Sequence, residues 1–161
     1  MSRIVSREEL LDCVHGDRAA GRSIAFANGC FDVLHVGHIR YLEGARAQAD
    51  RLVVAINDDD STRTLKGPGR PILSSADRAE LVSALRSVDY VIIFSEPDVN
   101  ELLRVLKPDV HCKGTDYTVD TVPERDTVRS YGGRTAIVGD PKDHSTRELI
   151  ARIGNRAHSP S

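Results

Sequence analysis

The sequence predicts an α/β fold, an open parallel sheet of five strands with helices on both faces. Two observations carry this prediction. Short apolar segments alternate with helical segments about five times along the 161 residues. The apolar segments are also continuous rather than alternating, which is typical of parallel strands covered on both faces. No linker or repeat divides the chain, so we expect one domain over 1–161, with an N-terminal helix in 1–21, a core in 22–153 and a frayed tail in 154–161.

The first predicted elements are a helix over 6–21 and a buried strand over 23–29. Ser6 and Glu9 have the spacing of a capping box, and apolar residues follow on one helical face. Those residues are Leu10, Leu11 and Val14. The strand ends at Asn28-Gly29, a turn signal.

The next predicted elements are a helix over 36–49, a buried strand over 51–57 and a loop over 61–73. The helix has apolar residues at helical spacing, and the loop is rich in Gly, Pro and Lys. The spaced residues are Ile39, Leu42 and Ala45.

In the middle of the chain, the sequence predicts a helix over 74–88, a strand over 89–94 and a helix over 98–106. A serine cap opens the first helix, and Lys107-Pro108 closes the second. The apolar face expected for the first helix consists of Ala79, Leu81, Val82 and Leu85.

The last third predicts strands over 109–112 and 134–139, separated by a helix over 122–133, and a final helix over 144–154. Pro123 lies near the start of the first of these helices. Ser145 and Glu148 have capping-box spacing in the second.

Composition excludes several functional classes. The net charge of −2, with 4% aromatic residues, indicates no nucleic-acid surface. No apolar run is long enough to span a bilayer, and residues 1–13 contain no apolar signal core. Three scattered cysteines, Cys13, Cys30 and Cys112, form no disulfide framework or metal-ligand spacing. We therefore expect a cytoplasmic protein without a membrane or nucleic-acid partner.

Polar residues gather where the predicted strands end. The loops 28–38, 57–67, 113–117 and 139–146 hold the densest polar chemistry of the chain. Because ligands of open α/β sheets bind beyond the carboxyl ends of the strands, these loops predict a functional site.

His35 and His38 flank Gly37 at the start of the second predicted helix. The free N–H groups of that helix start would bind an anion, and we expect His38 to reach the anion from one side and His35 from the other. Imidazoles placed there suit phosphoryl or nucleotidyl transfer, which needs positioning and charge stabilisation. The alternatives are structural histidines, or a zinc site for which no third ligand has a suitable spacing.

Other loops offer charged candidates. Lys66 is a flexible cation beside Gly67, either a phosphate ligand or a solvated lysine. The run Asp58–Asp60 indicates a solvated turn and helix entry rather than a metal cluster. Arg78, next to Asp77, is expected to form a surface salt bridge unless it contacts substrate.

The fourth strand and the last helix add four candidates. Lys113 ends a buried strand, and its position there predicts a cleft with an anionic ligand. Asp116 is placed to accept from a ribose hydroxyl or a base. Ser145 and Thr146 start the last helix and serve capping or phosphate binding.

Together, "NGCFDVLHVGHIRYL" resembles the signature of the cytidylyltransferase-like nucleotidyltransferase superfamily, a Rossmann-like fold with a His-x-Gly-His motif. Within it, the chain is most similar to adenylyltransferases that act on D-glycero-D-manno-heptose 1-phosphate, over roughly residues 20–153. The matching segments are 26–42, 52–72, 77–94 and 108–117. "KGTDY" resembles the "KGGDY" of the heptose enzymes, and "DPKDHST" lacks the Arg-Thr of the glycerol phosphate and choline phosphate cytidylyltransferases.

The resemblance implies transfer of AMP from ATP to a sugar 1-phosphate with release of pyrophosphate. It implies catalytic roles for His35, His38 and Lys66, substrate contacts at Lys66, Arg78 and Lys113, Mg²⁺ carried with ATP, no metal held by protein ligands alone, and a homodimer. The nucleotide-binding residues that it implies are Asn28, Gly29, Cys30, Phe31, Asp32, His35, Gly37, His38, Asp116, Ser145 and Thr146. The alternatives are a cytidylyltransferase for glycerol 3-phosphate or another alcohol phosphate, and a non-catalytic nucleotide-binding module.

Overall fold

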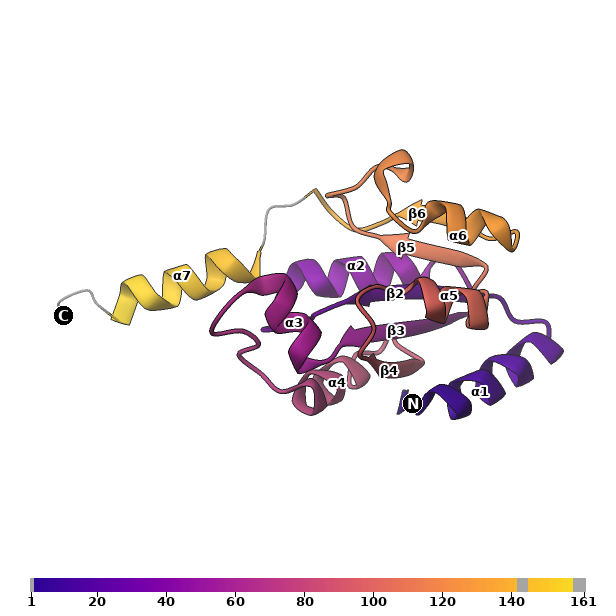
Figure 1. The fold of residues 1–161 in the computed structure, drawn as a ribbon, viewed down its shortest axis with the longest axis horizontal. Helices are drawn as coiled ribbons and strands as arrows, with labels where there is room; N and C mark the ends of the chain where they lie inside the picture. The colour runs from indigo at the N-terminus through magenta and orange to yellow at the C-terminus, as the bar shows by residue number, and fades with distance from the viewer. Residues whose placement is uncertain (1, 142–144, 158–161) are drawn as a thin grey trace.

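The computed structural model describes residues 2–141 and 145–157, and its centre is a six-stranded parallel sheet (Figure 1). The strand order is β1-β4-β3-β2-β5-β6. The bounds are β1 Arg3–Ile4, β2 Ile24–Gly29, β3 Arg51–Asn57, β4 Tyr90–Phe94, β5 Val110–Lys113 and β6 Arg134–Ile137. The predicted α/β class and the five predicted strands are confirmed.

The sixth strand, β1, is missing from the prediction. Arg3 and Ile4 pair with Tyr90 and Val91 at the edge of the sheet, and both β1 residues are exposed. A two-residue exposed strand has no apolar run, so only its tertiary pairing defines it.

Helices cover both faces of the sheet, as predicted. The bounds are α1 Arg7–Ala19, α2 Val36–Arg46, α3 Asp59–Lys66, α4 Ser75–Ser83, α5 Asn100–Leu106, the 3₁₀ helix η1 Val119–Thr121, α6 Arg125–Ser130 and α7 Thr146–Ala157. One core cluster takes side chains from α2 and α4, and the other takes them from α1, α5 and α6. Successive strand residues supply opposite clusters, for example Val53 and Val54, so each strand is apolar throughout.

Three local expectations need correction. The first half of the predicted loop 61–73 is helical, because Asp58 caps α3 by accepting from the Ser61 N–H. Leu81 is 45% exposed, so α4 does not bury it with Ala79 and Val82. Helix α7 extends to Ala157, into the predicted tail, and residues 158–161 of that tail lie outside the described residues.

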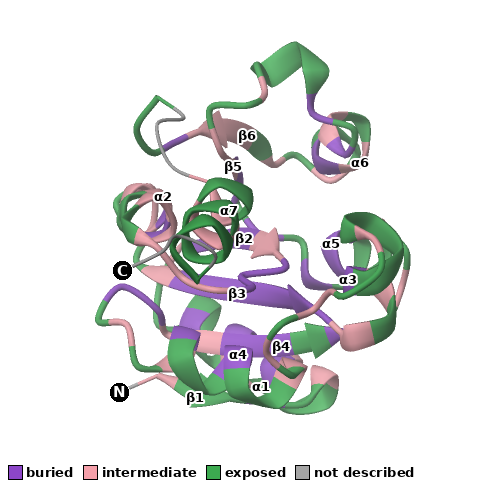
Figure 2. Ribbon diagram, turned by 90° about the vertical axis from the view of Figure 1, so that its left-hand side faces the viewer, coloured by how far each residue is buried: buried purple, intermediate pink, exposed green. Residues whose placement is uncertain are grey.

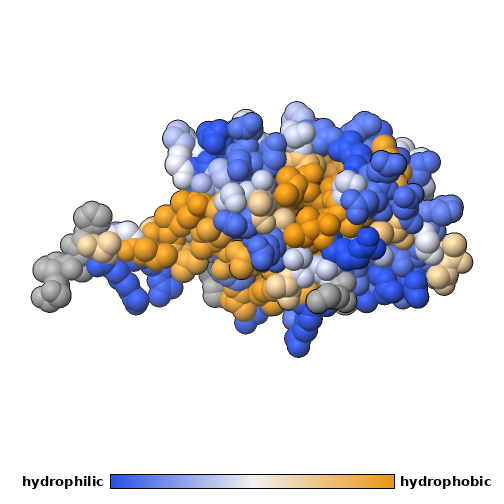
Figure 3. Space-filling view, turned by 90° about the horizontal axis from the view of Figure 1, so that it is seen from below, coloured by the Kyte–Doolittle hydropathy of each residue, from blue (hydrophilic) through white to orange (hydrophobic). Residues whose placement is uncertain are grey.

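Helix α7 extends away from the body (Figure 1), and it has no buried residue among those described (Figure 2). Figure 3 shows apolar residues gathered along it, and Ile153 is 60% exposed. Within the described parts of the chain, no helix has the length and apolar character needed to cross a bilayer.

The direction of winding reverses at β2. From β2 the chain adds β3 and then β4 on one side, and afterwards β5 and β6 on the other. In open parallel sheets this reversal opens a crevice beyond the carboxyl ends of the two strands at the switch point. The loops after β2 and β5 are therefore the expected floor of a ligand site.

Candidate active site

A cavity of about 550 Å³ lies beside these two loops. Positively charged or histidine side chains from four segments line it, one of these segments being the start of α7. These side chains are His35, His38, Lys66, Arg70 and Arg147. The loop after β5 completes this part of the wall. The volume is in the range of small-molecule sites, and the surplus of cations suits a polyanionic ligand.

The predicted site residues divide into two groups. The cavity is lined by seven of them: His35, Gly37, His38, Lys66, Asp116, Ser145 and Thr146. The described cavity wall does not include Asn28, Gly29, Cys30, Phe31, Asp32, Arg78 or Lys113. The residues of the second group lie next to the loops that carry the first group, or bind those loops in place.

The loop after β2 turns through two unusual backbone conformations. Phe31 and Val33 have φ angles of 50° and 61°, in the left-handed region, so the sharp turn occurs there rather than at Gly29. Gly29 serves a different purpose, because a Cβ there would lie 3.2 Å from the Phe31 ring. Phe31 is buried and its ring packs against those of His38 and Tyr41.

Asp32 holds this loop against the segment that precedes α4. Its buried carboxylate accepts from the backbone N–H groups of Ile72 and Leu73 and from Arg70 Nε, at 2.7 to 2.9 Å. Burial alone would raise the pKa of Asp32, but these three donors hold it below the ordinary value of 3.8. Asp32 therefore positions the loop as an ionised anchor.

The two histidine rings are stacked, with centroids 3.9 Å apart, instead of approaching from opposite sides. His35 Nδ1 accepts from the Gly37 N–H at 3.1 Å, and His38 Nδ1 accepts from the His35 N–H at 3.2 Å. Because each Nδ1 acts as an acceptor, each neutral ring carries its proton on Nε2. The start of α2 thus fixes the tautomers of both neutral rings.

This capping changes the expected anion site. The Gly37 N–H is bound by the His35 ring, and the N–H of His38 donates to the His35 carbonyl. These two backbone donors are occupied in the protein itself. Ligand binding at this helix start would therefore not use these two backbone N–H groups.

His38 is neutral in the ligand-free protein at pH 7. Burial is the main cause that lowers its pKa from 6.5 to about 4, and positive charge on His35, in its protonated form, and on Lys66 adds to it. An anion bound between these groups would offset the two charge effects and so raise the pKa of His38.

Two cations of the site are absent from the sequence prediction. Arg70 lies in the segment expected as a plain loop, and Arg147 is in the first turn of α7. Lys66, at the end of α3, lines the same cavity. The Gly- and Pro-rich sequence around Arg70 is a signal that could have identified Arg70 as a site residue. No feature of the sequence near Arg147 indicates that Arg147 lies close to residues 35–70.

Arg78 is not at the surface, so the expected surface salt bridge is wrong. Its side chain is completely buried and donates to the carbonyl oxygens of Leu73, Cys30 and Asn57 and to the Asp59 carboxylate. These donors hold protein groups together, and Arg78 lies behind the cavity wall.

Residues at the end of β5 form a second polar group. The His111 Nε2–H donates to Asn28 Oδ1 at 2.9 Å, and burial lowers the pKa of His111 to about 3. Lys113 follows on the same face of the strand, with its ammonium 4.8 Å from the centre of the Tyr117 ring.

The start of α7 closes one end of the cavity. Ser145 Oγ accepts from the Glu148 N–H, which confirms the predicted cap, and Thr146 Oγ1 donates to the Val33 carbonyl. The residues just before it, 142–144, which carry part of the "DPKDHST" comparison, lie outside the described residues.

The described residues contain no group of three or more His, Cys, Asp or Glu side chains that could hold a metal ion. Among the described residues, the carboxylates on the cavity wall are Asp116 and Asp140. This donor set fits a cation that arrives with a polyphosphate and keeps its phosphate and water ligands, rather than one bound in a protein cage.

The fold and this site are those of a nucleotidyltransferase-type α/β domain. Residues 26–153 match the family model described as Cytidylyltransferase-like, and the chain belongs to that family.

Its curated relatives include proteins named bifunctional protein HldE. The protein from Syntrophotalea carbinolica is 46% identical over 155 residues, which cover 96% of this chain and 32% of the relative. The protein from Pseudomonas entomophila is 49% identical over 150 residues, which cover 93% and 32%. The chain thus spans about a third of the length of these relatives.

A solved structure shares the fold. The crystal structure of the lipopolysaccharide core biosynthesis protein from Thermoplasma volcanium GSS1 is similar, with a TM-score of 0.66 and 29% identity. The match covers 76% of this chain and all of that one.

The anchor role of Asp32 predicts a pH-dependent loss of stability. Asp32→Asn removes the charge that two backbone N–H groups and Arg70 bind, and we expect a loss of about 2 kcal/mol in unfolding free energy at pH 7. Because the folded-state pKa is depressed, this contribution is complete above pH 4 and declines as the pH falls through the lowered value.

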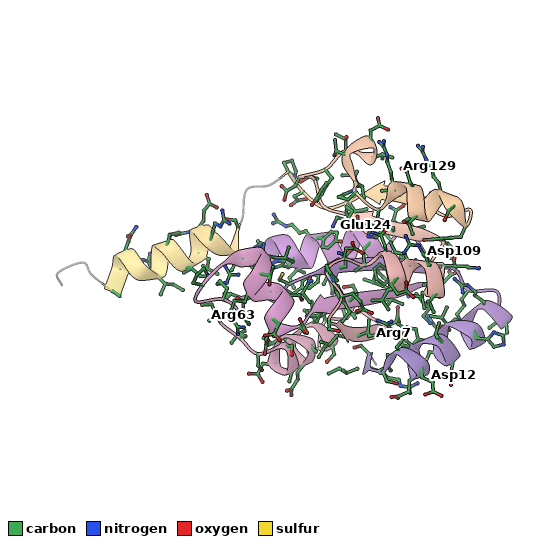
Figure 4. All side chains as sticks on the ribbon, viewed as in Figure 1. Arg7, Asp12, Arg63, Asp109, Glu124 and Arg129 are labelled. Carbon is green, nitrogen blue, oxygen red and sulfur yellow. The ribbon has the colours of Figure 1, made fainter. Side chains whose placement is uncertain are left out.

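Urea unfolding of wild type and variant at pH 7 and pH 3 measures this effect. The difference between them should shrink at the lower pH. Asp12→Asn is the matched control, because Asp12 points outward from α1 (Figure 4) and should change stability by less than about 0.5 kcal/mol. A pH-independent difference would contradict the assigned role.

The environment of His38 predicts its titration. NMR of the imidazole resonances, assigned with a His38→Gln variant, should give a pKa of about 4 in the free protein. Inorganic pyrophosphate should raise that pKa, because an anion stabilises the imidazolium form. An ordinary pKa near 6.5 without pyrophosphate, or no response to it, would refute the assigned environment.

Proposed function

We propose that this chain is an adenylyltransferase domain that transfers AMP from ATP to D-glycero-D-manno-heptose 1-phosphate and releases pyrophosphate. The observation that carries the proposal is the stacked pair His35 and His38, which lines a cavity together with Lys66, Arg70 and Arg147. Membership of the cytidylyltransferase-like family and the similarity to HldE proteins support it.

In this mechanism an oxygen of the acceptor phosphate attacks the α-phosphorus of ATP, and the bond from that phosphorus to the bridging oxygen of pyrophosphate breaks. The attacking phosphate is already ionised at neutral pH, so no general base is required. Negative charge grows on the leaving pyrophosphate.

The protein's contribution is placement and charge. The two Nε2–H groups donate to phosphate oxygens, while Lys66, Arg70 and Arg147 neutralise charge along the triphosphate. We assign Ser145 at the start of α7 to the β- and γ-phosphates, together with Thr146 once its hydroxyl turns from the Val33 carbonyl, and Asp116 to the nucleoside. Mg²⁺ bound to the triphosphate would neutralise further phosphate charge, near Asp116 and Asp140.

The remaining expectations belong to the same proposal. The nucleotide would pass over the backbone of Cys30 and Phe31, and the protein would act as a cytoplasmic homodimer. We assign Asp32 and Arg78 to positioning these loops, since their polar atoms are bound within the protein.

A pyrophosphate-release assay tests the substrate pair. ATP or CTP is combined with heptose 1-phosphate or glycerol 3-phosphate, and we expect turnover with ATP and heptose 1-phosphate. The relatives do not favour the cytidylyltransferase alternative. Turnover with CTP and glycerol 3-phosphate alone would overturn the proposal.

Replacing His38 separates an enzyme from a nucleotide-binding module. His38→Ala removes a donor that acts on charge formed during the reaction, so kcat should fall about 100- to 1000-fold while ATP affinity changes far less. His15→Ala, exposed on α1, is the control and should match wild type. A loss of ATP affinity as large as the loss of turnover would indicate a binding role instead.

A further inference from the structure

A second cavity, of about 370 Å³, lies between α3 and the segment that leads to α4. The residues that line it are Asp59, Arg63, Gly69, Arg70, Pro71 and Ser74. Figure 4 shows Arg63 between α3 and this segment. A Cβ added to Gly69 would meet no atom within 4 Å, so the backbone there is open to an approaching ligand.

Contacts inside the protein hold the walls of this second cavity. Asp32 accepts from two backbone N–H groups of the segment 70–73 and so fixes that segment. Asp59 Oδ1 accepts from the Ser75 N–H at 2.8 Å and from Arg78 Nη2 at 2.9 Å, which joins the start of α3 to the start of α4. A cavity whose walls are fixed in advance loses little conformational entropy when a ligand binds.

The second cavity offers hydrogen-bond donors and an acceptor on one helix face. Asp59 and Arg63 are four residues apart on α3, a spacing that places both side chains on the same side of the helix. Arg63 Nη1 pairs with Asp60 at 3.1 Å, and no described residue bonds its Nε or Nη2. Asp59 Oδ2 likewise bonds no described residue. Guanidinium N–H groups and a carboxylate oxygen together suit neighbouring hydroxyls, each of which both donates and accepts.

Arg70 lines both cavities. Its Nε donates to Asp32 at 2.7 Å, which fixes the position of the guanidinium. Its two Nη groups bond no described residue, and they are not among the buried polar atoms without a partner, so they are accessible to a ligand. Arg70 therefore lies at the junction of the two cavities and offers donors there.

The proposed reaction requires two substrates to be bound at once, with the acceptor phosphate beside the α-phosphorus of ATP. The first cavity, of about 550 Å³, and the second, of about 370 Å³, are each in the size range of a site for one small molecule. A sugar phosphate whose phosphate lies at Arg70 would extend its sugar away from the nucleotide and into the second cavity.

We infer that the second cavity is the subsite for the sugar of the acceptor. Arg70 binds the acceptor phosphate at the junction, and Arg63 and Asp59 bind hydroxyl groups of the sugar. The inference rests on the proposed function and adds to it the place where the acceptor is recognised. Arg63 is then a specificity residue that contacts the sugar and not the nucleotide.

Arg63→Gln tests this subsite, because it removes the charge and the paired N–H groups from a side chain that is 58% exposed. We expect the KM of heptose 1-phosphate to rise at least about tenfold, while the KM of ATP stays within about twofold and the thermal midpoint is unchanged. Arg86→Gln is the matched control. Arg86 is also an exposed arginine in an ion pair, with Glu43 at 3.1 Å, and the described walls of both cavities do not include it.

Monodeoxy analogues of the sugar phosphate identify the hydroxyl that Arg63 binds. The analogue without that hydroxyl should be a poor substrate for wild type and should lose nothing further in Arg63→Gln, whereas an indirect structural effect would weaken every analogue equally. Arg63→Lys keeps the charge but not the paired N–H groups, so its KM should lie between those of wild type and Arg63→Gln. This variant replaces Arg63→Gln if the latter does not fold.

The outcomes separate this inference from the proposed function. If wild type turns over a different acceptor, the heptose assignment fails and the same variants are measured with that acceptor. If wild type shows no turnover, calorimetric titration of the ATP-saturated protein with heptose 1-phosphate measures the loss of affinity directly. An acceptor constant within about twofold of wild type in Arg63→Gln, an equal loss for ATP, or no binding of the sugar phosphate would overturn the sugar subsite.

Discussion

The buried guanidinium of Arg78 is the interaction on which the geometry of the site depends. It joins the carbonyl oxygens of Cys30, Asn57 and Leu73, which belong to the loop after β2, the end of β3 and the segment before α4. A fourth N–H, on Nη2, binds Asp59 at the start of α3. Removing this charge would leave buried acceptors without donors, a cost of about 3–5 kcal/mol. The histidine loop and the helix that ends at Lys66 are therefore fixed to the same group.

Asp32 supplies the complementary tie, a buried anion that binds Arg70 and two backbone N–H groups. Two charged groups thus connect the segment 70–73 to the loop after β2. The Arg78 guanidinium binds carbonyl oxygens of both segments, and the Asp32 carboxylate, in the loop, binds donors of the segment. This connection brings Arg70 to the cavity while its Nε remains bound to Asp32. The charges of Asp32 and Arg78 thus fix the loops around the cavity, and the cations that line the cavity are carried by these loops and the adjacent helices.

The parts predictable from sequence are those with local signals. Continuous apolar runs gave the strands, Ser6 and Ser145 gave their caps, and the His-x-Gly-His spacing placed both histidines on the cavity wall. The missed features depend on contacts between distant segments. Arg78 is an ordinary helical arginine until its four partners surround it.

The environment of the histidine pair fits the polyanion site that we propose. Two stacked imidazolium ions beside Lys66 would repel one another, and burial opposes charge on His38 as well. The protein keeps His38 neutral and fixes the tautomer of each neutral ring with a backbone N–H. The rings therefore offer oriented hydrogen bonds, while Lys66, Arg70 and Arg147 supply the positive charge. Donors oriented before the ligand arrives need no rearrangement as charge develops. This need for a fixed ring explains why His35 lies at the N-cap of α2. There its Nδ1 accepts from the Gly37 N–H of the same helix that carries His38.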